Sequence, residues 1–267
     1  MSAVITLKTE RQSLNSSESI HKRVDEGKLN WATPLLFLPA RSILLILGQS
    51  VFALFYYLHG YPSPWDTAGK WWTVWGTIAD LGCLSILFLL IRMENILIVD
   101  LIGALPKRTI LTGIVFFFII APFSAAGSVL GSWLVYGSWH VVLPAGELYA
   151  RQLPLWGMLY SLILWAPIWS VTEEITYNGY LAPRIDLLFG RRWITLILIG
   201  FWWALQHSFL PLIADWHFIV WRFLAFLPCV LAFAAIYLRT RKLAPLIVAH
   251  WMMDMIAAFT TISFAHK

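Results

Sequence analysis

The chain has 267 residues, of which 60% are hydrophobic and only 12% are charged. A water-soluble domain carries roughly 25% charged residues, so this composition excludes a typical soluble globule, and the hydrophobicity also excludes a disordered chain. The net charge of +5 comes from short basic clusters between apolar segments, which is typical of membrane topology and not of a nucleic-acid-binding stripe. We therefore expect an integral membrane protein with no nucleic-acid partner.

The first 34 residues differ from the rest of the chain. They are polar and of mixed charge, with five Lys or Arg against four Asp or Glu. They contain no early apolar segment, so we do not expect them to be a cleaved signal peptide. We expect residues 1–34 to be a flexible cytoplasmic leader and residues 35–267 to form a single transmembrane domain without an internal linker.

Apolar segments follow one another from Pro34 to the end, each near the ~20 residues that a spanning helix needs. They predict an all-α, polytopic transmembrane helical bundle of about seven spans. We place these spans at residues 35–58, 71–91, 109–136, 153–180, 193–213, 218–238 and 243–263. The fourth segment contains Pro154, Pro167 and Pro183, each of which tends to kink a helix, and it can be one long broken helix that continues towards Gly190.

Loop charges predict the orientation of these helices. One set of alternate loops holds nine basic residues, and the other set holds only Lys70 and Arg151. The nine are Arg92, Lys107, Arg108, Arg184, Arg191, Arg192, Arg239, Arg241 and Lys242. Because cytoplasmic loops carry an excess of Lys and Arg, this bias places the N-terminus in the cytoplasm and, with seven spans, the C-terminus outside.

Small residues in the apolar segments predict close packing. Gly127 and Gly131 form a small-xxx-small pair, which indicates a contact with another helix. Cys83 and Cys229 both lie inside apolar segments, and they form neither a disulfide framework nor a metal-binding pattern. We expect both cysteines to be core residues.

Six ionisable side chains inside the apolar segments carry the functional prediction. Each costs at least ~2.5–3.5 kcal/mol at the centre of a bilayer, so these are the informative residues. They are Asp80, Glu173, Glu174, His207, His250 and Asp254. Asp80 has no titratable neighbour in the sequence, and we expect it to pack or to pair helices. Arg41 and Arg222 lie near predicted helix ends, where they can snorkel to the membrane surface.

The adjacent glutamates are typical of a proton-transfer site. Glu173 and Glu174 point about 100° apart on a helix, so one can face a cavity while the other bonds to a neighbouring helix. Two carboxyl groups in an apolar environment are the setting in which proteins tune a general acid or base. If the fourth helix continues to Gly190, Glu173 lies at a depth similar to that of His207 and His250.

The two histidines lie on separate helices, each with a partner one turn away. Trp203 precedes His207 by four residues and shares its face of the helix. Asp254 follows His250 by four residues in the same way. A carboxylate so placed can hold one imidazole nitrogen and fix the tautomer of the other. With the glutamates, these groups can jointly hold a reactive water molecule.

This order of residues resembles the type II CAAX prenyl endopeptidase family, also called the Abi or CPBP family of intramembrane proteases. The family motifs are Glu-Glu-xxx-Arg, Phe-xxx-His and His-xxx-Asn. This chain has Glu173-Glu174-Ile-Thr-Tyr-Asn178, Trp203-Ala-Leu-Gln-His207 and His250-Trp-Met-Met-Asp254, and the resemblance covers about residues 160–260. Three positions depart from the motifs: Asn178 stands where the family has Arg, Trp203 replaces Phe and Asp254 replaces Asn.

The resemblance implies a role for each residue. Glu173 would activate a water that attacks a scissile carbonyl, and Glu174 would orient or assist it. Three residues would position the water and stabilise the oxyanion, namely His207, His250 and Asp254. Asn178 and Trp203 would support the site or the substrate.

The metal requirement is left open by the residue types. The family has been described both as metalloproteases and as glutamate proteases without metal. One carboxylate and two histidines could hold Zn²⁺ with an open fourth position. The His-Glu-xx-His pattern of zinc helices is absent from the sequence, so we favour the metal-free mechanism and keep zinc as the alternative.

We therefore predict an intramembrane endopeptidase whose partners are the lipid bilayer and a membrane-associated peptide or protein substrate. The candidate substrates are a prenylated C-terminus, a leader or peptide of a maturation system, and a bacteriocin-type peptide, and the sequence does not choose among them. The rival prediction is a non-enzymatic bundle that binds a peptide or a membrane protein, as an immunity or scaffold protein does. A third is a transporter that uses Glu173 as a proton site.

Overall fold

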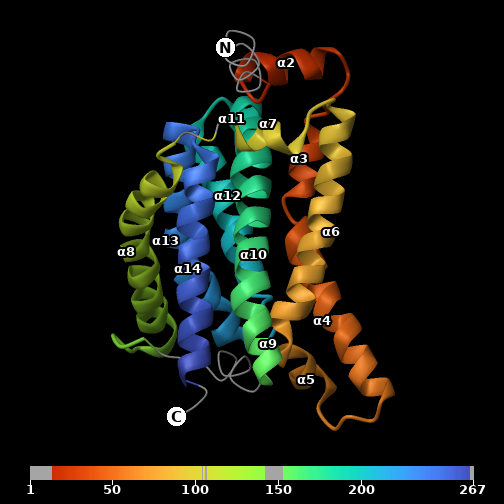
Figure 1. Ribbon diagram of the computed structural model, residues 1–267, viewed down its shortest axis with the longest axis vertical. Helices are drawn as coiled ribbons and strands as arrows, with labels where there is room; N and C mark the ends of the chain where they lie inside the picture. Colours follow the sequence, from red (N-terminus) through yellow and green to blue (C-terminus); the bar gives the residue numbers. More distant parts are fainter. Residues whose placement is uncertain (1–13, 104, 106, 142–152, 265–267) are drawn as a thin grey trace.

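The computed structural model describes residues 14–103, 105, 107–141 and 153–264, and for residues 260–264 it describes the backbone alone. The described residues form a bundle of helices without a strand, which confirms the predicted all-α class (Figure 1). Helices α2 (Ser17–Asp25), α7 (Ile98–Ile102) and α11 (Ala182–Phe189) lie at one end, and α5 (Pro64–Lys70) and α9 (Leu155–Tyr160) lie at the other.

Longer helical segments connect these two ends. The first half of the chain contributes α3 (Ala32–Phe37) with α4 (Ala40–Leu58), which together make one segment, and then α6 (Trp72–Met93) and α8 (Thr109–Tyr136). The second half contributes the segment that begins with α9, followed by α12 (Arg192–His207), α13 (Trp216–Thr240) and α14 (Leu243–Phe264). Helix α12 ends at His207, before the predicted boundary at residue 213, and a turn around Pro211 connects it to α13.

The fourth predicted span is one long broken helix. It runs through α9, the π-helical segment η2 (Ser161–Trp165), α10 (Ala166–Glu173), the π-helical segment η3 (Glu174–Leu181) and α11. Each π-helical segment ends just before a proline, Pro167 or Pro183, which cannot donate a backbone hydrogen bond. Gly190 ends the helix in the left-handed conformation, with φ 61°. The predicted continuation towards Gly190 is therefore confirmed.

Five helical segments of the described chain are long and apolar enough to cross a membrane. They are Ala32–Leu58, Trp72–Met93, Thr109–Tyr136, Leu155–Phe189 and Trp216–Thr240, and each matches a predicted span. Helix α12 has 16 residues, and Leu243–Phe259 counts as a shorter apolar helix. The polytopic transmembrane class is confirmed, and the sixth and seventh spans stay predictions.

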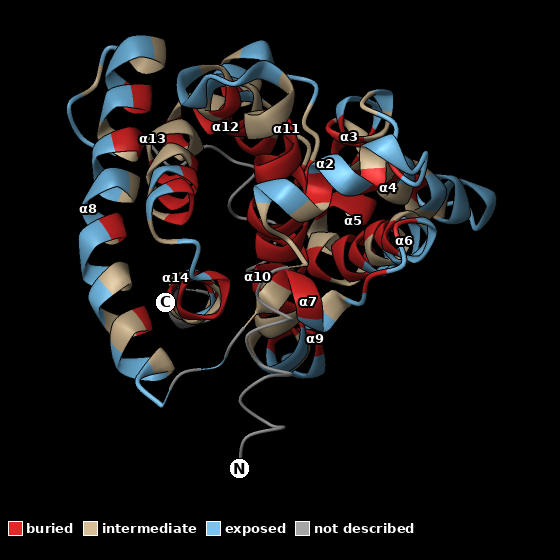
Figure 2. Cartoon of the chain, turned by 90° about the horizontal axis from the view of Figure 1, so that it is seen from above, coloured by how far each residue is buried: buried red, intermediate tan, exposed pale blue. Residues whose placement is uncertain are grey.

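Glycines bring α8 against its neighbours. A Cβ atom at Gly127 would lie 2.2 Å from the carbonyl oxygen of Ala225, and one at Gly131 would lie 3.2 Å from that of Trp221, both on α13. The predicted small-xxx-small contact is thus confirmed. The opposite face of α8 is exposed over most of its length, as expected of a helix that faces lipid (Figure 2).

Buried residues concentrate where the long broken helix meets α6, α12, α13 and α14 (Figure 2). Cys83 and Cys229 are both buried in this core, as predicted. Trp203, Tyr177 and Phe233 fill its centre and have less than 2% of their surface exposed. This core surrounds the polar residues singled out in the sequence.

The described part of the leader packs on the bundle. Ile20 and Arg23 of α2 are buried, and Glu94 accepts from Arg23 Nε at 2.9 Å. Glu94 also accepts from Arg184 of α11, through Nε at 3.0 Å and Nη2 at 2.5 Å. The expectation of a flexible tail is therefore wrong for α2, because its apolar and cationic side chains have buried partners. The division of the chain at residue 34 stays a prediction.

Candidate active site

Four helical segments bring the predicted site residues together in the middle of the bundle. Glu173 ends α10 and Glu174 begins η3, so the change from α-helical to π-helical backbone occurs between them. Trp203 and His207 lie on the last turn of α12, and His250 lies on α14. Both glutamates are fully buried, and the two histidines are less than 8% exposed. The two glutamates and the two histidines therefore lie close together, as the sequence analysis expected.

One oxygen of Glu173 is held by two donors. Oε1 accepts a hydrogen bond of 2.7 Å from Gln206 Nε2. The same oxygen lies 2.6 Å from Nη1 of Arg41, which approaches from α4. An ion pair and a hydrogen bond from a side-chain amide, both to the same oxygen, fix the orientation of the carboxylate plane.

The other oxygen of Glu173 faces both histidines. Oε2 accepts a hydrogen bond from the indole N–H of Trp203. It lies 3.8 Å from Nε2 of His207 and 3.6 Å from Nε2 of His250. These separations are too long for direct hydrogen bonds. Glu173 Oε2 therefore points at two imidazole nitrogens without being bonded to either.

Glu174 has a separate set of partners. Its Oε1 lies 3.1 Å from Nδ1 of His250, and its Oε2 accepts a hydrogen bond of 2.8 Å from Asn178 Nδ2. With Nδ1–H donated to Glu174, the Nε2 atom of His250 is the nitrogen that faces Glu173. Glu174 thus orients the imidazole, and Asn178 orients Glu174.

The ring of His207 is held by stacking. It lies parallel to Phe226 of α13, with ring centroids 3.8 Å apart. The backbone carbonyl of His207 accepts a hydrogen bond of 3.2 Å from Arg222 Nε. Asp254 lies near the other histidine, with Oδ2 3.7 Å from Nε2 of His250, and this oxygen has no hydrogen-bond partner among the described residues.

Arg41 and Asp80 also belong to this cluster. Arg41 is 2% exposed and bonds to Asp80 through Nη2, so the expectation that it snorkels to the surface is wrong. The reason is that two carboxylates, Asp80 and Glu173, compensate its charge inside the bundle. Asp80 joins α6 to α4, which confirms its predicted role in pairing helices.

Two further residues of the cluster were missed by the sequence analysis. Gln206 donates to Glu173, and its Oε1 accepts from the Tyr177 hydroxyl at 2.8 Å. Tyr177 in turn stacks on Trp203, with ring centroids 5.0 Å apart. Both are uncharged, so the cost of burying charge did not single them out. The one available signal is that Gln206 is the neighbour of His207 in the second motif.

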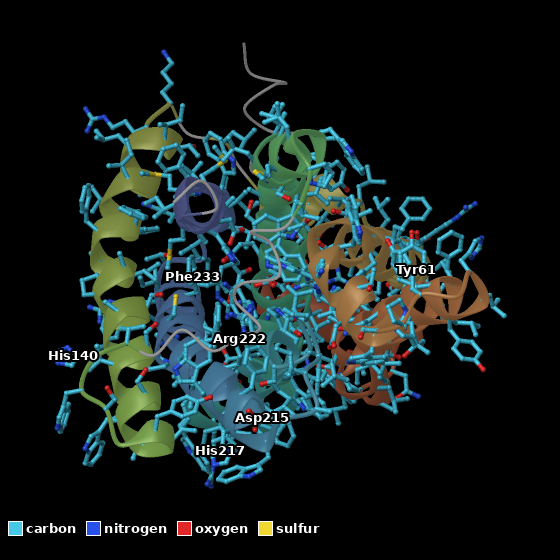
Figure 3. All side chains as sticks on the ribbon, turned by 90° about the horizontal axis from the view of Figure 1, so that it is seen from below. Tyr61, His140, Asp215, His217, Arg222 and Phe233 are labelled. Carbon is cyan, nitrogen blue, oxygen red and sulfur yellow. The ribbon has the colours of Figure 1, made fainter. Side chains whose placement is uncertain are left out.

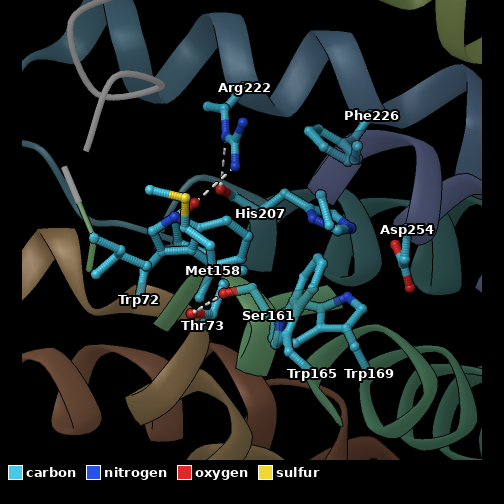
Figure 4. A pocket seen from close by; sticks show the side chains of 14 residues that line it. Trp72, Thr73, Met158, Ser161, Trp165, Trp169, His207, Arg222, Phe226 and Asp254 are labelled. Atoms are coloured by element: carbon cyan, nitrogen blue, oxygen red, sulfur yellow. Dashed lines mark hydrogen bonds between the residues drawn. The ribbon is translucent and has the colours of Figure 1, made fainter. Parts of the chain in front are cut away.

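A cavity of about 170 Å³ reaches the site from the end of the bundle that carries α9 (Figure 4). Its lining is mainly aromatic and apolar, and it includes Trp72, Met158, Trp165, Trp169, Leu210 and Phe226. The polar residues of its lining are His207, Arg222, Asp254 and the hydrogen-bonded pair Ser161 and Thr73, whose hydroxyls are 2.9 Å apart. Glu173 is not part of this lining, but its Oε2 lies 3.8 Å from Nε2 of His207, which is.

Arg222 is another correction to the sequence analysis. It is 7% exposed and points into the bundle, whereas Tyr61, Asp215 and His217 lie at the periphery (Figure 3). Its Nη2 donates to the carbonyl of Leu210 at 2.7 Å. Arg222 does not snorkel because the turn after α12 offers it backbone carbonyls, and it lines the cavity instead.

Both oxygens of Glu173 already have partners. The Arg41 cation lies 2.6 Å from Oε1, and the Trp203 indole donates to Oε2. The described residues contain no group of three or more His, Cys, Asp or Glu side chains arranged to hold a metal.

One comparison with known proteins matches part of this chain. Residues 151–256 match the family described as type II CAAX prenyl endopeptidase Rce1-like. This range contains both glutamates and both histidines, together with Asp254, whereas Arg41 and Asp80 lie outside it. The comparisons with curated proteins and with solved structures gave no match.

Proposed function

Since this chain carries a type II CAAX prenyl endopeptidase Rce1-like domain over residues 151–256, we propose that it is an intramembrane endopeptidase in which Glu173 activates a water molecule. The family is one of proteases, which supports peptide-bond hydrolysis as the reaction class. The observation that carries the mechanism is the position of Glu173 Oε2 at 3.6 and 3.8 Å from two imidazole nitrogens. Polar atoms at such separations are commonly bridged by one water.

The mechanism follows from the orientation of each group. Glu173 accepts the proton of the bridging water as its oxygen attacks the scissile carbonyl. His250, flanked by the carboxylates of Glu173, Glu174 and Asp254, carries a proton on both ring nitrogens, so it donates Nδ1–H to Glu174 and Nε2–H to the developing oxyanion. His207, held by stacking on Phe226, donates Nε2–H to the same oxyanion. The proton on Glu173 then passes to the leaving amine, which restores the carboxylate.

The cavity indicates the kind of substrate. An aromatic and apolar channel that ends at His207 and Asp254 fits an extended peptide with apolar side chains, presented from within the membrane. Its lining includes Met158 of α9 and Trp72 at the start of α6, so it lies towards the end of the bundle that carries α9. The loop charges support a cytoplasmic position for the opposite end, which carries α2.

The test is cleavage of two defined probes by the purified protein in liposomes. One is an internally quenched peptide with a farnesylated C-terminal CAAX sequence, and the other is the same peptide anchored by an apolar leader segment. We expect Glu173→Gln to lower kcat by at least about 10²-fold, because the amide cannot accept the proton. Glu18→Gln, the same change at an exposed position on α2, is the matched control.

Three results would argue against this proposal. Equal cleavage by Glu173→Gln and by the unaltered protein would remove Glu173 as the base. Binding of both probes without cleavage, unchanged in Glu173→Gln, would favour the non-enzymatic peptide-binding function. Proton-coupled flux into the liposomes that is lost in Glu173→Gln would favour the transporter.

A further inference from the structure

A buried arginine from outside the family domain touches the proposed base. Arg41 lies on the first turns of α4, and only 2% of its surface is exposed. Its guanidinium lies over the ring of Trp169, 4.2 Å from the centroid, and its Nη1 lies 2.6 Å from Glu173. Arginine stays charged at any pH at which proteins fold, so this is a permanent positive charge beside the carboxylate.

Arg41 binds two carboxylates at the same time. Nη1 binds Glu173 Oε1 and also donates to Gln206 Oε1 at 3.1 Å, while Nη2 binds Asp80 Oδ1. Asp80 is fully buried on α6, so it holds the far side of the guanidinium from a second helix. The planar guanidinium group of arginine can bind both carboxylates in this geometry. A lysine would supply the same charge but could not donate in both of these fixed directions.

The motif residue that usually carries the positive charge near the glutamates is absent here. Position 178 is Asn, and its amide donates to Glu174 at 2.8 Å, not to Glu173. The cation that contacts the glutamate pair therefore comes from α4. In apolar surroundings an unpaired carboxylic acid holds its proton and cannot act as a base, so the cation has a specific consequence for Glu173.

We propose that Arg41 is a positioning residue for the cleavage reaction, held by Asp80, and that it keeps Glu173 ionised with Oε2 aimed at the histidines. This inference rests on the function proposed above, in which Glu173 accepts the proton of the attacking water. Arg41 fixes Oε1, which leaves Oε2 as the oxygen that faces His207 and His250.

The kinetic test uses Arg41→Gln, Arg41→Lys and a matched control on the same helix. We expect Arg41→Gln to lower kcat for the farnesylated probe on the order of 10²-fold with KM nearly unchanged, and Arg41→Lys to recover part of that loss. The control is Gln49→Met, since Gln49 is buried on α4 and bonds only to the backbone of Leu212. It should lower stability and leave kcat of the folded protein intact.

A spectroscopic test reads the ionisation of Glu173 without a substrate. The double variant Arg41→Gln/Asp80→Asn removes one charge of each sign, which guards against unfolding by an unpaired carboxylate. We expect the infrared difference spectrum between this variant and the unaltered protein at neutral pH to show an additional protonated-carboxyl band. Adding Glu173→Gln should remove the band.

The outcomes separate this inference from the proposed function. A kcat for Arg41→Gln equal to that of Gln49→Met, or a double variant without the protonated-carboxyl band, would overturn the role of Arg41. Neither result would affect the case for Glu173 as the base. If neither probe is cleaved by the unaltered protein, the infrared test still decides whether Arg41 keeps Glu173 ionised.

Discussion

Glu173 and Glu174 are neighbours in the chain, yet their carboxylates contact different helices. Glu173 faces α4 and α12, while Glu174 faces α14 and its own turn through Asn178. The two therefore cannot exchange roles, because one is fixed by a cation and the other by an imidazole. The angle between adjacent helical residues already predicts this division.

Asp254 offers a test at the residue scale. Its Oδ2 lies 3.7 Å from His250 Nε2 and is not hydrogen-bonded by any described residue, so its charge is not essential to the geometry. We expect Asp254→Asn to retain most of its kcat/KM for the farnesylated probe, whereas His250→Gln loses about 10²-fold or more. If Asp254→Asn loses as much as His250→Gln, the carboxylate itself takes part in the reaction.

The sequence alone predicts some residues of the site and misses others. Charged groups in apolar segments stand out because burying them is costly, and this criterion found both glutamates and both histidines. It set aside Arg41 because a residue near a helix end can reach the surface. The pairing of Arg41 with Asp80 depends on how α4 and α6 pack, which no local pattern encodes. Gln206 and Tyr177 carry no charge and gave no signal.

At the scale of helices, the backbone of the fourth span is shaped by its prolines. The π-helical segment η3 begins at Glu174, so all eight of its residues, Glu174–Leu181, have a wider turn than an α-helix and all are buried. The prolines predicted a broken helix, and the continuation to Gly190 brought Glu173 to the depth of the histidines. The π-helical turns themselves could not be predicted. The α-helical period of 3.6 residues fits the helices on both sides of them, and it gives no sign of a wider turn in between.

The contact between α8 and α13 gives a prediction at this scale. Gly127→Ala places a methyl group 2.2 Å from a backbone carbonyl, so the helices must separate. We expect a loss of about 1–3 kcal/mol in the free energy of unfolding, measured by thermal unfolding in detergent. Gly82→Ala is the matched control, since its Cβ would lie 3.6 Å from Leu44 and alanine favours a helix. Equal stability of the two variants would contradict the tight contact.

At the scale of the whole molecule, charge is distributed unevenly between the two ends. The end with α2, α7 and α11 carries the basic loop residues and the Glu94 cluster, and the cavity lies towards the opposite end, where Met158 of α9 lines it. The loop charges predicted the sense of this asymmetry. They could not predict that α2 packs on the bundle, because the buried ion pair between Arg23 and Glu94 joins segments far apart in the chain.

Cysteine labelling in intact cells tests the orientation. Lys107 and Tyr61 are exposed at opposite ends of the bundle, and the native cysteines, Cys83 and Cys229, are buried. We expect a membrane-impermeant maleimide added outside to label Tyr61→Cys at once and Lys107→Cys only after permeabilisation. The unaltered chain is the control for the native thiols. The reverse pattern would invert the topology and the side towards which the cavity lies.

The Arg41–Asp80 pair also bears on how the chain enters the membrane. Helices α4 and α6 are synthesised well before residue 173, so during translation the guanidinium has Asp80 as its partner and does not have to wait for Glu173. The two helices can insert as a hairpin whose opposite charges cancel in the lipid. On this order of synthesis, α10 adds a second carboxylate to a cation that Asp80 already balances, so the cluster around Glu173 would form on a hairpin whose buried charges are paired.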